Sequence, residues 1–184
     1  MLAAVQLVSG FDVQRQNMVL GQIQPFGVMD EGILAAFGTV PREQFVAAHC
    51  QNVAYIEGAL NTKLLEAAVH AKWLQAANIK VADKILALDD NSGYGVAILK
   101  MLAKNVATQP LDKTKYDVVV CHAAVSQLDE LQSYLATLKE GGRLLAFYDS
   151  KAIIYERFGA NIAMRVLFDA FVPCAAPPKT NFVF

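Results

Sequence analysis

The residues best placed to do chemistry lie in one stretch, Ile85–Leu102, where an apolar run meets a polar turn and then a second apolar pattern. Ile85–Leu88 predicts a buried strand, and the spacing of the apolar residues after Gly95 predicts a helix. A strand, a small-residue turn and a helix start make up the nucleotide-binding corner of doubly wound α/β folds, where backbone N–H groups face the ligand.

The turn itself carries an unusual set of side chains for such a corner. Asp89, Asp90, Asn91 and Ser92 occupy it, and only Gly93 and Gly95 remain as glycines. Carboxylates at a helix N-terminus satisfy unpaired N–H groups and complement the positive end of the helix dipole. The sequence therefore predicts that the strand, turn and helix are retained, and that the protein's own side chains fill the place of a ligand.

Composition restricts the classes of protein to consider. The chain has 184 residues, 55% of them hydrophobic, a mean hydropathy of +0.33 and a formal net charge of −1. This length suits one domain with a sizeable core. The near-zero net charge argues against nucleic acid as a partner. No apolar run is long enough to span a membrane, and the N-terminus lacks a basic signal region, so we expect a cytoplasmic protein or one on the cytoplasmic or matrix side of a membrane complex.

The metal-ligating residue types do not form a pattern. They are Cys50, Cys121, Cys174, His49, His70 and His122. The cysteines are odd in number and far apart, which predicts reduced and mostly buried thiols. His70 follows Glu66 by four residues on an expected helix, which predicts a solvated pair. We expect no metal site.

Periodicity predicts the remaining elements. We expect a helix over 12–21, a turn at Pro25 and Gly27, and a short helix capped by Asp30. Further helices are predicted over 42–48, over 61–77 as a buried helix, and over 128–138, where Gly141 and Gly142 stop the helix. Extended segments are predicted as a short piece over 105–109, strands over 117–121 and 143–148, and an antiparallel hairpin of 153–158 with 164–171.

Several of these segments resemble protein-L-isoaspartate O-methyltransferases, which are class I enzymes that use S-adenosylmethionine (SAM). The matching strings are Asn17-Met-Val-x-x-Gln-Ile-x-Pro-x-Gly-Val-x-Asp, Val40-Pro-Arg-Glu-x-Phe-Val, Tyr116-Asp-Val-Val-Val and Leu138-x-x-Gly-Gly-Arg-Leu. The resemblance implies a three-layer Rossmann-like class I methyltransferase fold of the α/β class, with a reduced, mostly parallel sheet and a C-terminal antiparallel hairpin. We expect one domain, with a helical extension over 1–58 and the α/β core over 59–184, and we expect Arg42 and Glu43 to form a structural pair with the turn before them.

Three departures from the family pattern affect its binding sites. The substrate loop is shortened, which leaves remnant contacts at Leu60 and Thr62. In the cofactor loop the acidic position becomes Ala87 and two glycines become Asp89 and Asn91, where a Cβ makes positive φ costly. The implied cofactor contacts are reduced to a remnant at Asp89, Asn91, Gly93 and Tyr94.

The third departure is one of length. One strand–helix unit is missing between Gly95 and Tyr116, and only Gln109 or Asp112 stands near the place of the acid that holds the cofactor ribose. Each such unit needs about 30 residues.

Three functions stay open on these grounds. The first is a catalytically inactive member that binds no cofactor, has no catalytic residue and serves as an accessory subunit of a larger intracellular complex, for instance a membrane-associated respiratory one. The second is an active SAM-dependent protein-L-isoaspartate (D-aspartate) O-methyltransferase of protein repair. The third is a module that binds a different small ligand at the altered corner.

Overall fold

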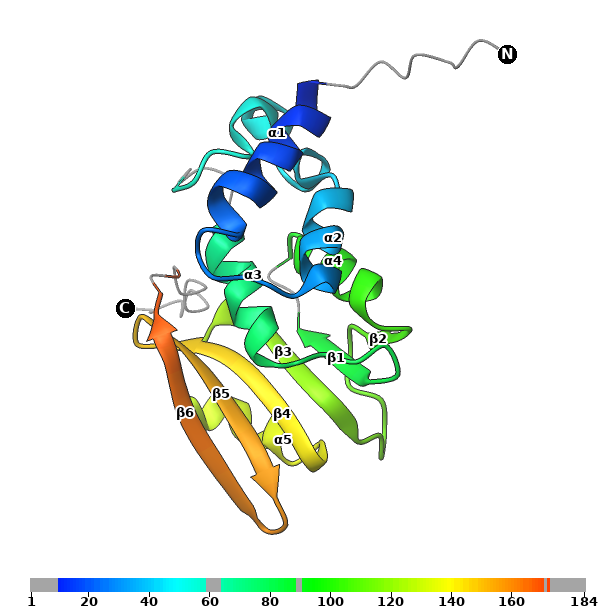
Figure 1. Ribbon diagram of the computed structural model, residues 1–184. Helices are drawn as coiled ribbons and strands as arrows, with labels where there is room; N and C mark the ends of the chain where they lie inside the picture. The colour runs from blue at the N-terminus through cyan, green and yellow to red at the C-terminus, as the bar shows by residue number, and fades with distance from the viewer. Residues whose placement is uncertain (1–9, 59–63, 89–90, 171, 173–184) are drawn as a thin grey trace, which may run out of the picture.

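The computed structural model describes residues 10–58, 64–88, 91–170 and 172 of the chain (Figure 1). Its helices are α1 (Gly10–Met18), α2 (Glu31–Thr39), α3 (Ala67–Ala76), α4 (Tyr94–Leu102) and the short α5 (Gln132–Leu135). A π-helical turn, Val19–Ile23, follows α1, and 3-10 turns span Arg42–Phe45, Ala48–Val53 and Leu128–Leu131.

A single six-stranded sheet forms the centre of the fold. Its strands are β1 (Lys84–Leu88), β2 (Asn105–Ala107), β3 (Tyr116–Ala124), β4 (Leu138–Tyr148), β5 (Lys151–Phe158) and β6 (Asn161–Asp169). The spatial order is β2-β1-β3-β4-β5-β6, in which β2 to β4 run parallel and β5 and β6 add antiparallel. The predicted α/β architecture with a reduced parallel sheet and a closing hairpin is therefore confirmed.

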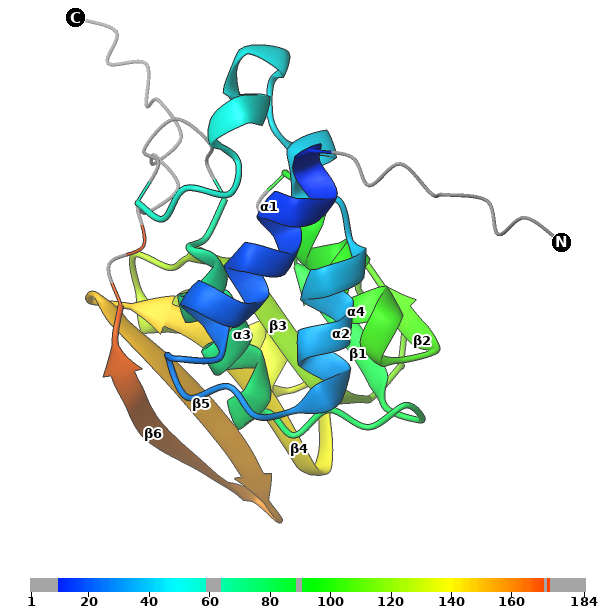
Figure 2. The ribbon, with the colours of Figure 1, turned by 45° about the horizontal axis from the view of Figure 1, so that its top comes forward.

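The two faces of the sheet are covered unequally. On one face, here called the first face, Ile85 and Val118 pack in a core that includes Phe37 of α2, Trp73 of α3 and Leu99 of α4. Figure 2 shows α1 to α4 gathered over this face. The opposite or second face carries a smaller core, to which the 3-10 turn and α5 contribute Leu131 and Leu135 against Leu86 and Val119 of the sheet. The central strands are consequently buried on both sides, as their unbroken apolar sequence predicts.

The parallel part of the sheet ends early at β2. This strand has three residues, pairs with β1 from Lys84 to Leu86, and is followed by residues 108–115, which contain no helix and lead directly into β3. The prediction of one helix and one short extended piece after Gly95 is confirmed. The edge of the sheet where a longer α/β fold would continue is thus a three-residue strand.

Local signals placed some boundaries correctly and others not. Asp30 caps α2 as predicted, because its carboxylate accepts a hydrogen bond from the Ile33 N–H at 2.9 Å. The helix predicted over 61–77 begins only at Ala67, and its first residues, 61–63, lie outside the described part of the chain.

Gly141 and Gly142 do not stop a helix. They lie inside β4, in a bulge where Tyr116 pairs with Leu138 and Val118 already pairs with Arg143. Gly141 has a φ of 68°, and a Cβ at Gly142 would come within 2.9 Å of the Lys139 carbonyl oxygen. The bulge therefore uses glycine at these two positions, because one needs positive φ and the other has no room for a Cβ.

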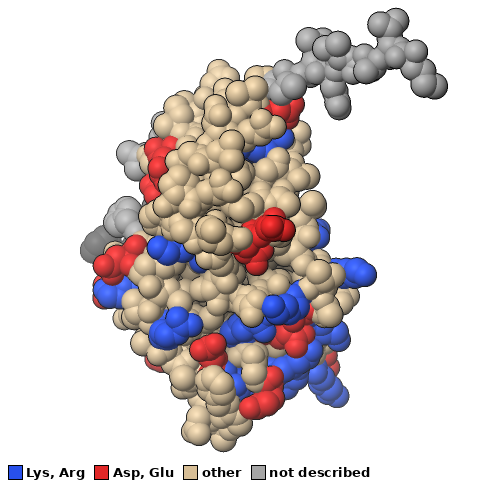
Figure 3. Space-filling view, viewed as in Figure 1, with Lys and Arg blue, Asp and Glu red and all other residues tan. Residues whose placement is uncertain are grey.

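Charged side chains of both signs are interspersed over the part of the surface that the strands form, as Figure 3 shows. Arg143 forms an ion pair with Asp83 at 2.8 Å, and Lys139 forms one with Asp117 at 2.6 Å. Burial opposes ionisation of Asp117, but hydrogen bonds from Lys139 and from the Lys84 N–H outweigh it and lower the pKa of that carboxyl. Within the described residues, no helix is long and apolar enough to cross a membrane.

Candidate functional site

In the turn between β1 and α4, the described residues 91–93 have a backbone of the kind that ligand-binding corners use, although most of the glycines are replaced. Asn91 and Gly93 both adopt left-handed conformations, with φ of 68° and 78°. Asparagine is one of the few residues with a Cβ that accept this region at small cost. Asn91 thus adopts the positive φ that the sequence predicted to be costly there, while Asp89 and Asp90, predicted to fill the corner, lie outside the described residues.

The start of α4 is capped by Ser92. Gly93 occupies the N-cap position, and the Ser92 Oγ accepts a hydrogen bond from the Tyr94 N–H at 3.1 Å. The first turn of the helix contains no acidic residue. Among the described residues the bond to the first helical N–H thus comes from a serine, and the carboxylates predicted to cap the helix, Asp89 and Asp90, lie outside them.

Residues 42–45, in the 3-10 turn that follows α2, pack against Tyr94 at the start of α4. The guanidinium carbon of Arg42 lies 5.0 Å from the centroid of the Tyr94 ring, and the Phe45 ring lies 5.4 Å from it. Phe45 would also be the nearest neighbour, at 3.7 Å, of a Cβ added to Gly93. Burial raises the pKa of the Tyr94 hydroxyl, against an opposing effect of Arg42. Tyr94 therefore anchors α4 in the core, and Asn91 and Gly93 are the predicted cofactor contacts that reach the surface.

Arg42 also holds both flanks of the predicted substrate loop. Its Nε donates to the Ala54 carbonyl at 2.7 Å, and one of its terminal nitrogens donates to the Leu65 carbonyl at 2.8 Å. Leu60 and Thr62, the predicted substrate remnants, lie between these two anchors and outside the described residues. The prediction that Arg42 pairs with Glu43 and the preceding turn is wrong, because Arg42 binds backbone carbonyls instead.

Glu43 belongs to a separate buried network with Arg15 and Tyr55. The Tyr55 hydroxyl donates to the Glu43 carboxylate at 2.5 Å, and Arg15 donates to Tyr55 at 3.0 Å and to Glu43 at 3.3 Å. Burial, together with the bond to Glu43, raises the pKa of Tyr55 to about 12. Arg15 precedes Glu43 by 28 residues, so no local pattern in the sequence could connect them.

Two histidines lie buried between α3, α4 and β3. His70 has a ring centroid 5.1 Å from that of His122, and burial, with His122 and Arg42 nearby, lowers the pKa of His70 well below its usual value. The predicted solvated pair of His70 with Glu66 is therefore wrong, because α3 turns His70 into the core. A Cβ at Gly95 would lie only 2.2 Å from the His122 Nε2. His122 and Gly95 thus fit together as a large and a small residue.

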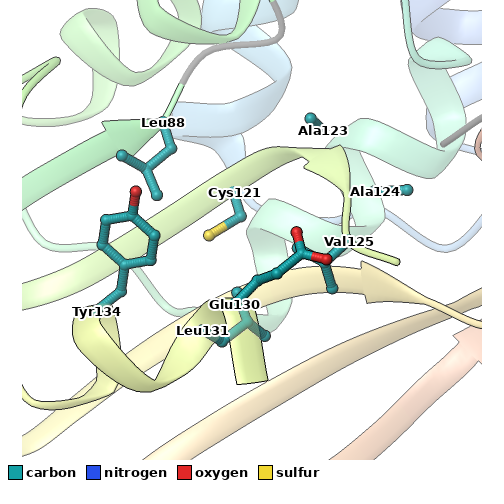
Figure 4. A pocket seen from close by; sticks show the side chains of 8 residues that line it. All are labelled: Leu88, Cys121, Ala123, Ala124, Val125, Glu130, Leu131 and Tyr134. Carbon is teal, nitrogen blue, oxygen red and sulfur yellow. The ribbon is translucent and has the colours of Figure 1, made fainter. Parts of the chain in front are cut away.

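A cavity of about 250 Å³ opens on the second face at the C-terminal ends of β1 and β3, where ligands bind in open α/β sheets (Figure 4). Figure 4 shows Tyr134 beside Leu88, Cys121 to the right of both, and the Glu130 carboxylate near Val125. The lining is mainly apolar; its residues are Leu88, Cys121, Ala123, Ala124, Val125, Glu130, Leu131 and Tyr134.

The polar groups of this cavity are not arranged as a nucleophile and its base. Burial raises the pKa of the Cys121 thiol to about 12. Glu130 is engaged by Ser126 and Gln127, whose hydrogen bonds lower the pKa of its carboxyl. Cys50 is also a buried thiol, and no group of three or more metal-ligating side chains occurs in the described ranges. The cavity can hold a small ligand by shape, and it offers no activated nucleophile.

Comparison with known proteins matches this chain to one family. Residues 14–109 match the family described as protein-L-isoaspartate(D-aspartate) O-methyltransferase, or PCMT. A protein-L-isoaspartate O-methyltransferase of Koribacter versatilis is 36% identical over 111 residues, which cover 58% of this chain and 50% of that protein. One of Herpetosiphon aurantiacus is 29% identical over 188 residues and covers 80% and 83%. The chain spans about half the length of most of the curated relatives it matches.

Solved structures share the fold. A structure titled protein-L-isoaspartate O-methyltransferase superimposes with a TM-score of 0.71 at 14% identity, covering 89% of this chain and 66% of the other. A putative protein-L-isoaspartate O-methyltransferase of Plasmodium falciparum, solved in complex with S-adenosyl-L-homocysteine, gives a TM-score of 0.63 at 14% identity and covers 87% and 97%. At this identity the likeness establishes the fold alone.

Proposed function

Because the chain belongs to the protein-L-isoaspartate O-methyltransferase family, we propose that it binds SAM at the C-terminal ends of β1 and β3 and methylates isoaspartyl carboxylates of proteins. The observation that carries the proposal is the backbone of residues 91–93. Asn91 and Gly93 keep positive φ at the N-terminus of α4, a backbone conformation that is found in turns that bind ligands through N–H groups. Named relatives support the same activity.

The cavity on the second face fits part of such a cofactor. Its volume of about 250 Å³ lies just below the range of about 300–1,000 Å³ typical of pockets for whole drug-sized ligands. Its apolar walls and the Tyr134 ring suit a flat heterocycle. We assign the nucleoside end of SAM to this cavity and the remainder to the backbone of residues 91–93.

In this site the protein contributes position rather than proton transfer. Bound SAM would supply a methyl group on a positively charged sulfur: a carboxylate oxygen would bond to the methyl carbon as the methyl–sulfur bond breaks, and S-adenosylhomocysteine would be the leaving group. Phe45 and Tyr94 support the corner from the core, and Arg42 fixes both flanks of the segment that contains Leu60 and Thr62. Holding two reactants in line is sufficient to accelerate such a transfer, and no general acid or base is required.

The test combines ligand binding with two matched glycine variants. A ligand at 100 times its Kd stabilises the folded state by about 2.7 kcal/mol, which raises the Tm of a chain of this size by about 5–10 °C. We expect S-adenosylhomocysteine to produce this shift in the wild type and in Gly141→Ala, and to lose it in Gly93→Ala. Both glycines have positive φ, 78° and 68°, but Gly141 lies in the bulge of β4, away from the corner. The wild type should also methylate an isoaspartyl peptide and leave the aspartyl peptide unmodified.

A catalytically silent accessory subunit is the second candidate, and one observation favours it. β2 ends at Ala107, is followed by Thr108 and Gln109, and continues without a helix into β3. No acid therefore stands at the end of β2 to hold a ribose. An unchanged Tm at millimolar S-adenosylhomocysteine, absence of methyl transfer, and co-purification of a stoichiometric protein partner would together favour this candidate over the enzyme.

A further inference from the structure

In the described part of the chain, the outer edge of β6 is open. β6 is the last strand of the sheet, and no other described strand pairs with its outer side (Figure 1). It has nine residues, which makes it about 30 Å long. A strand edge of this length presents a row of unpaired N–H and C=O groups, and it can template the pairing of another strand.

This edge lacks most of the features that protect edge strands. Arg165 is the only cation within β6, and the strand contains no proline. Its single irregularity is a register shift near Val166 and Phe168, which leaves Asn161–Val166 in regular pairing with β5. The part of the strand from Asn161 to Val166 therefore contains no bulge that would hinder pairing with a neighbour.

One side of β6 is apolar and exposed. Ile162, Met164 and Val166 are 40%, 50% and 47% exposed. They pair with Arg157, Tyr155 and Ile153 of β5, so they lie on the second face, which α5 covers only in part. Three large apolar side chains at a spacing of two residues form a ladder that water solvates poorly.

The ladder is complementary to itself. In an antiparallel pair centred on Met164, the residue Ile162 of one copy stands opposite Val166 of the other, and Met164 stands opposite Met164. Arg165 then faces Ala163, so no like charges are opposed. A register displaced by one residue would place Met164 opposite Arg165 and would break the apolar ladder. A register displaced by two residues, centred on Arg165, would place Arg165 opposite Arg165.

From this pattern we propose that β6 pairs antiparallel with β6 of a second copy of this chain, across a two-fold axis at Met164, to form a continuous sheet of two molecules. A two-fold contact uses the same surface on both partners, which the sequence Ile162-x-Met164-x-Val166 satisfies. Main-chain hydrogen bonds hold the pair and the ladder sets its register, as in other strand additions. One nine-residue strand per partner buries less than a standard interface, so the dimer dissociates at low concentration.

Sedimentation of the full chain between micromolar and millimolar concentrations tests the dimer. The mean mass should rise from one chain toward two in the wild type, whereas Met164→Lys should remain monomeric. Met101→Lys is the matched control, since Met101 is 53% exposed on α4 and its substitution should leave the dimer intact. A monomeric wild type at every concentration overturns the proposal.

Cross-linking tests the register. In a Cys174→Ser background, Met164→Cys places two thiols on opposite sides of the proposed axis, within the reach of a disulfide. Oxidation should yield a covalent dimer on a non-reducing gel. Arg165→Cys points to the other face and lies off the axis, so it should not cross-link. Equal cross-linking of both variants refutes this register, and failure of Met164→Cys refutes the pairing.

Discussion

The fit between Gly95 and His122 gives the most direct test of how the corner is built. A Cβ on residue 95 would lie 2.2 Å from Nε2, 2.3 Å from Cδ2 and 2.7 Å from Cε1 of the imidazole. Ordinary contacts begin at 3.4 Å, so the ring would have to move by about 1.2 Å. His122 cannot easily do so, because it is packed against His70 and Trp73 and its Nδ1 lies 3.3 Å from the Leu88 carbonyl oxygen.

Gly95→Ala should therefore destabilise the protein even though alanine favours helices. Overpacking of a buried site costs about 1–3 kcal/mol, and this overlap belongs at the upper end. Alanine in place of glycine returns up to about 1 kcal/mol within a helix. We expect the free energy of unfolding to fall by about 2 kcal/mol and the Tm by about 4–8 °C, measured by urea denaturation and by thermal unfolding.

Removing the imidazole should rescue the alanine. His122→Ala alone leaves a cavity and should cost about 2–4 kcal/mol. In the double variant the new methyl group occupies part of that space, so the two changes together should cost about 2 kcal/mol less than their sum. The control is Gly38→Ala in α2, where the added Cβ would meet only Val19 at 3.8 Å and the stability should stay equal or rise. Additive effects of Gly95→Ala and His122→Ala would refute the reasoning.

Three further predictions follow from the buried polar groups. Because the pKa of His70 is lowered in the folded protein, the unfolded state binds a proton below about pH 6.5 and the folded state does not. The free energy of unfolding should therefore fall with decreasing pH, by up to about 1.4 kcal/mol per pH unit. His70→Phe should flatten this slope in urea titrations from pH 7 to pH 5. Tyr55→Phe removes a hydroxyl that serves both Glu43 and Arg15 and should cost about 1–3 kcal/mol in the same assay. The Cys121 thiol, with a pKa raised to about 12, should resist iodoacetamide in the folded protein and react after unfolding, as peptide mapping can show.

Each of these has an outcome that contradicts it. An equal pH slope in wild type and His70→Phe would mean that His70 is protonated in the folded state. Neutral behaviour of Tyr55→Phe would mean that water replaces the hydroxyl between Glu43 and Arg15. Rapid alkylation of Cys121 in the folded protein would mean that the second-face cavity opens to solvent.

Periodicity and composition predicted the elements better than their boundaries. The apolar runs at Ile85–Leu88 and 117–121 could only be buried strands, and the shortage of residues between Gly95 and Tyr116 excluded a full strand–helix unit. Glycine was the less reliable signal, because the same residue type ends helices and makes bulges. At Gly141 and Gly142 the pairing of β4 with β3 decided between these uses.

Some residues of the candidate site could also be identified from the sequence, and others could not. Asn91 and Gly93 were identifiable from their position after a strand, since the conformation of a turn depends on its own residues. Arg15, Glu43 and Tyr55 were not, because their hydrogen bonds join segments up to 40 residues apart. His70 was misjudged because helical spacing to Glu66 describes the helix surface and says nothing about which side the sheet covers.

The sequence by itself determined the order of strands and helices along the chain, because it follows from apolar periodicity. It also indicated the family through its matching sequence strings, and the reduced length of the parallel sheet through the number of residues between Gly95 and Tyr116. Tertiary structure alone decided that Arg42 binds the Ala54 and Leu65 carbonyls on both flanks of the predicted substrate loop, that His122 fills the space left by Gly95, and that β6 presents an open apolar edge among the described strands. Those features arise where distant segments meet, and the distances between such segments are fixed by packing rather than by any neighbouring residue.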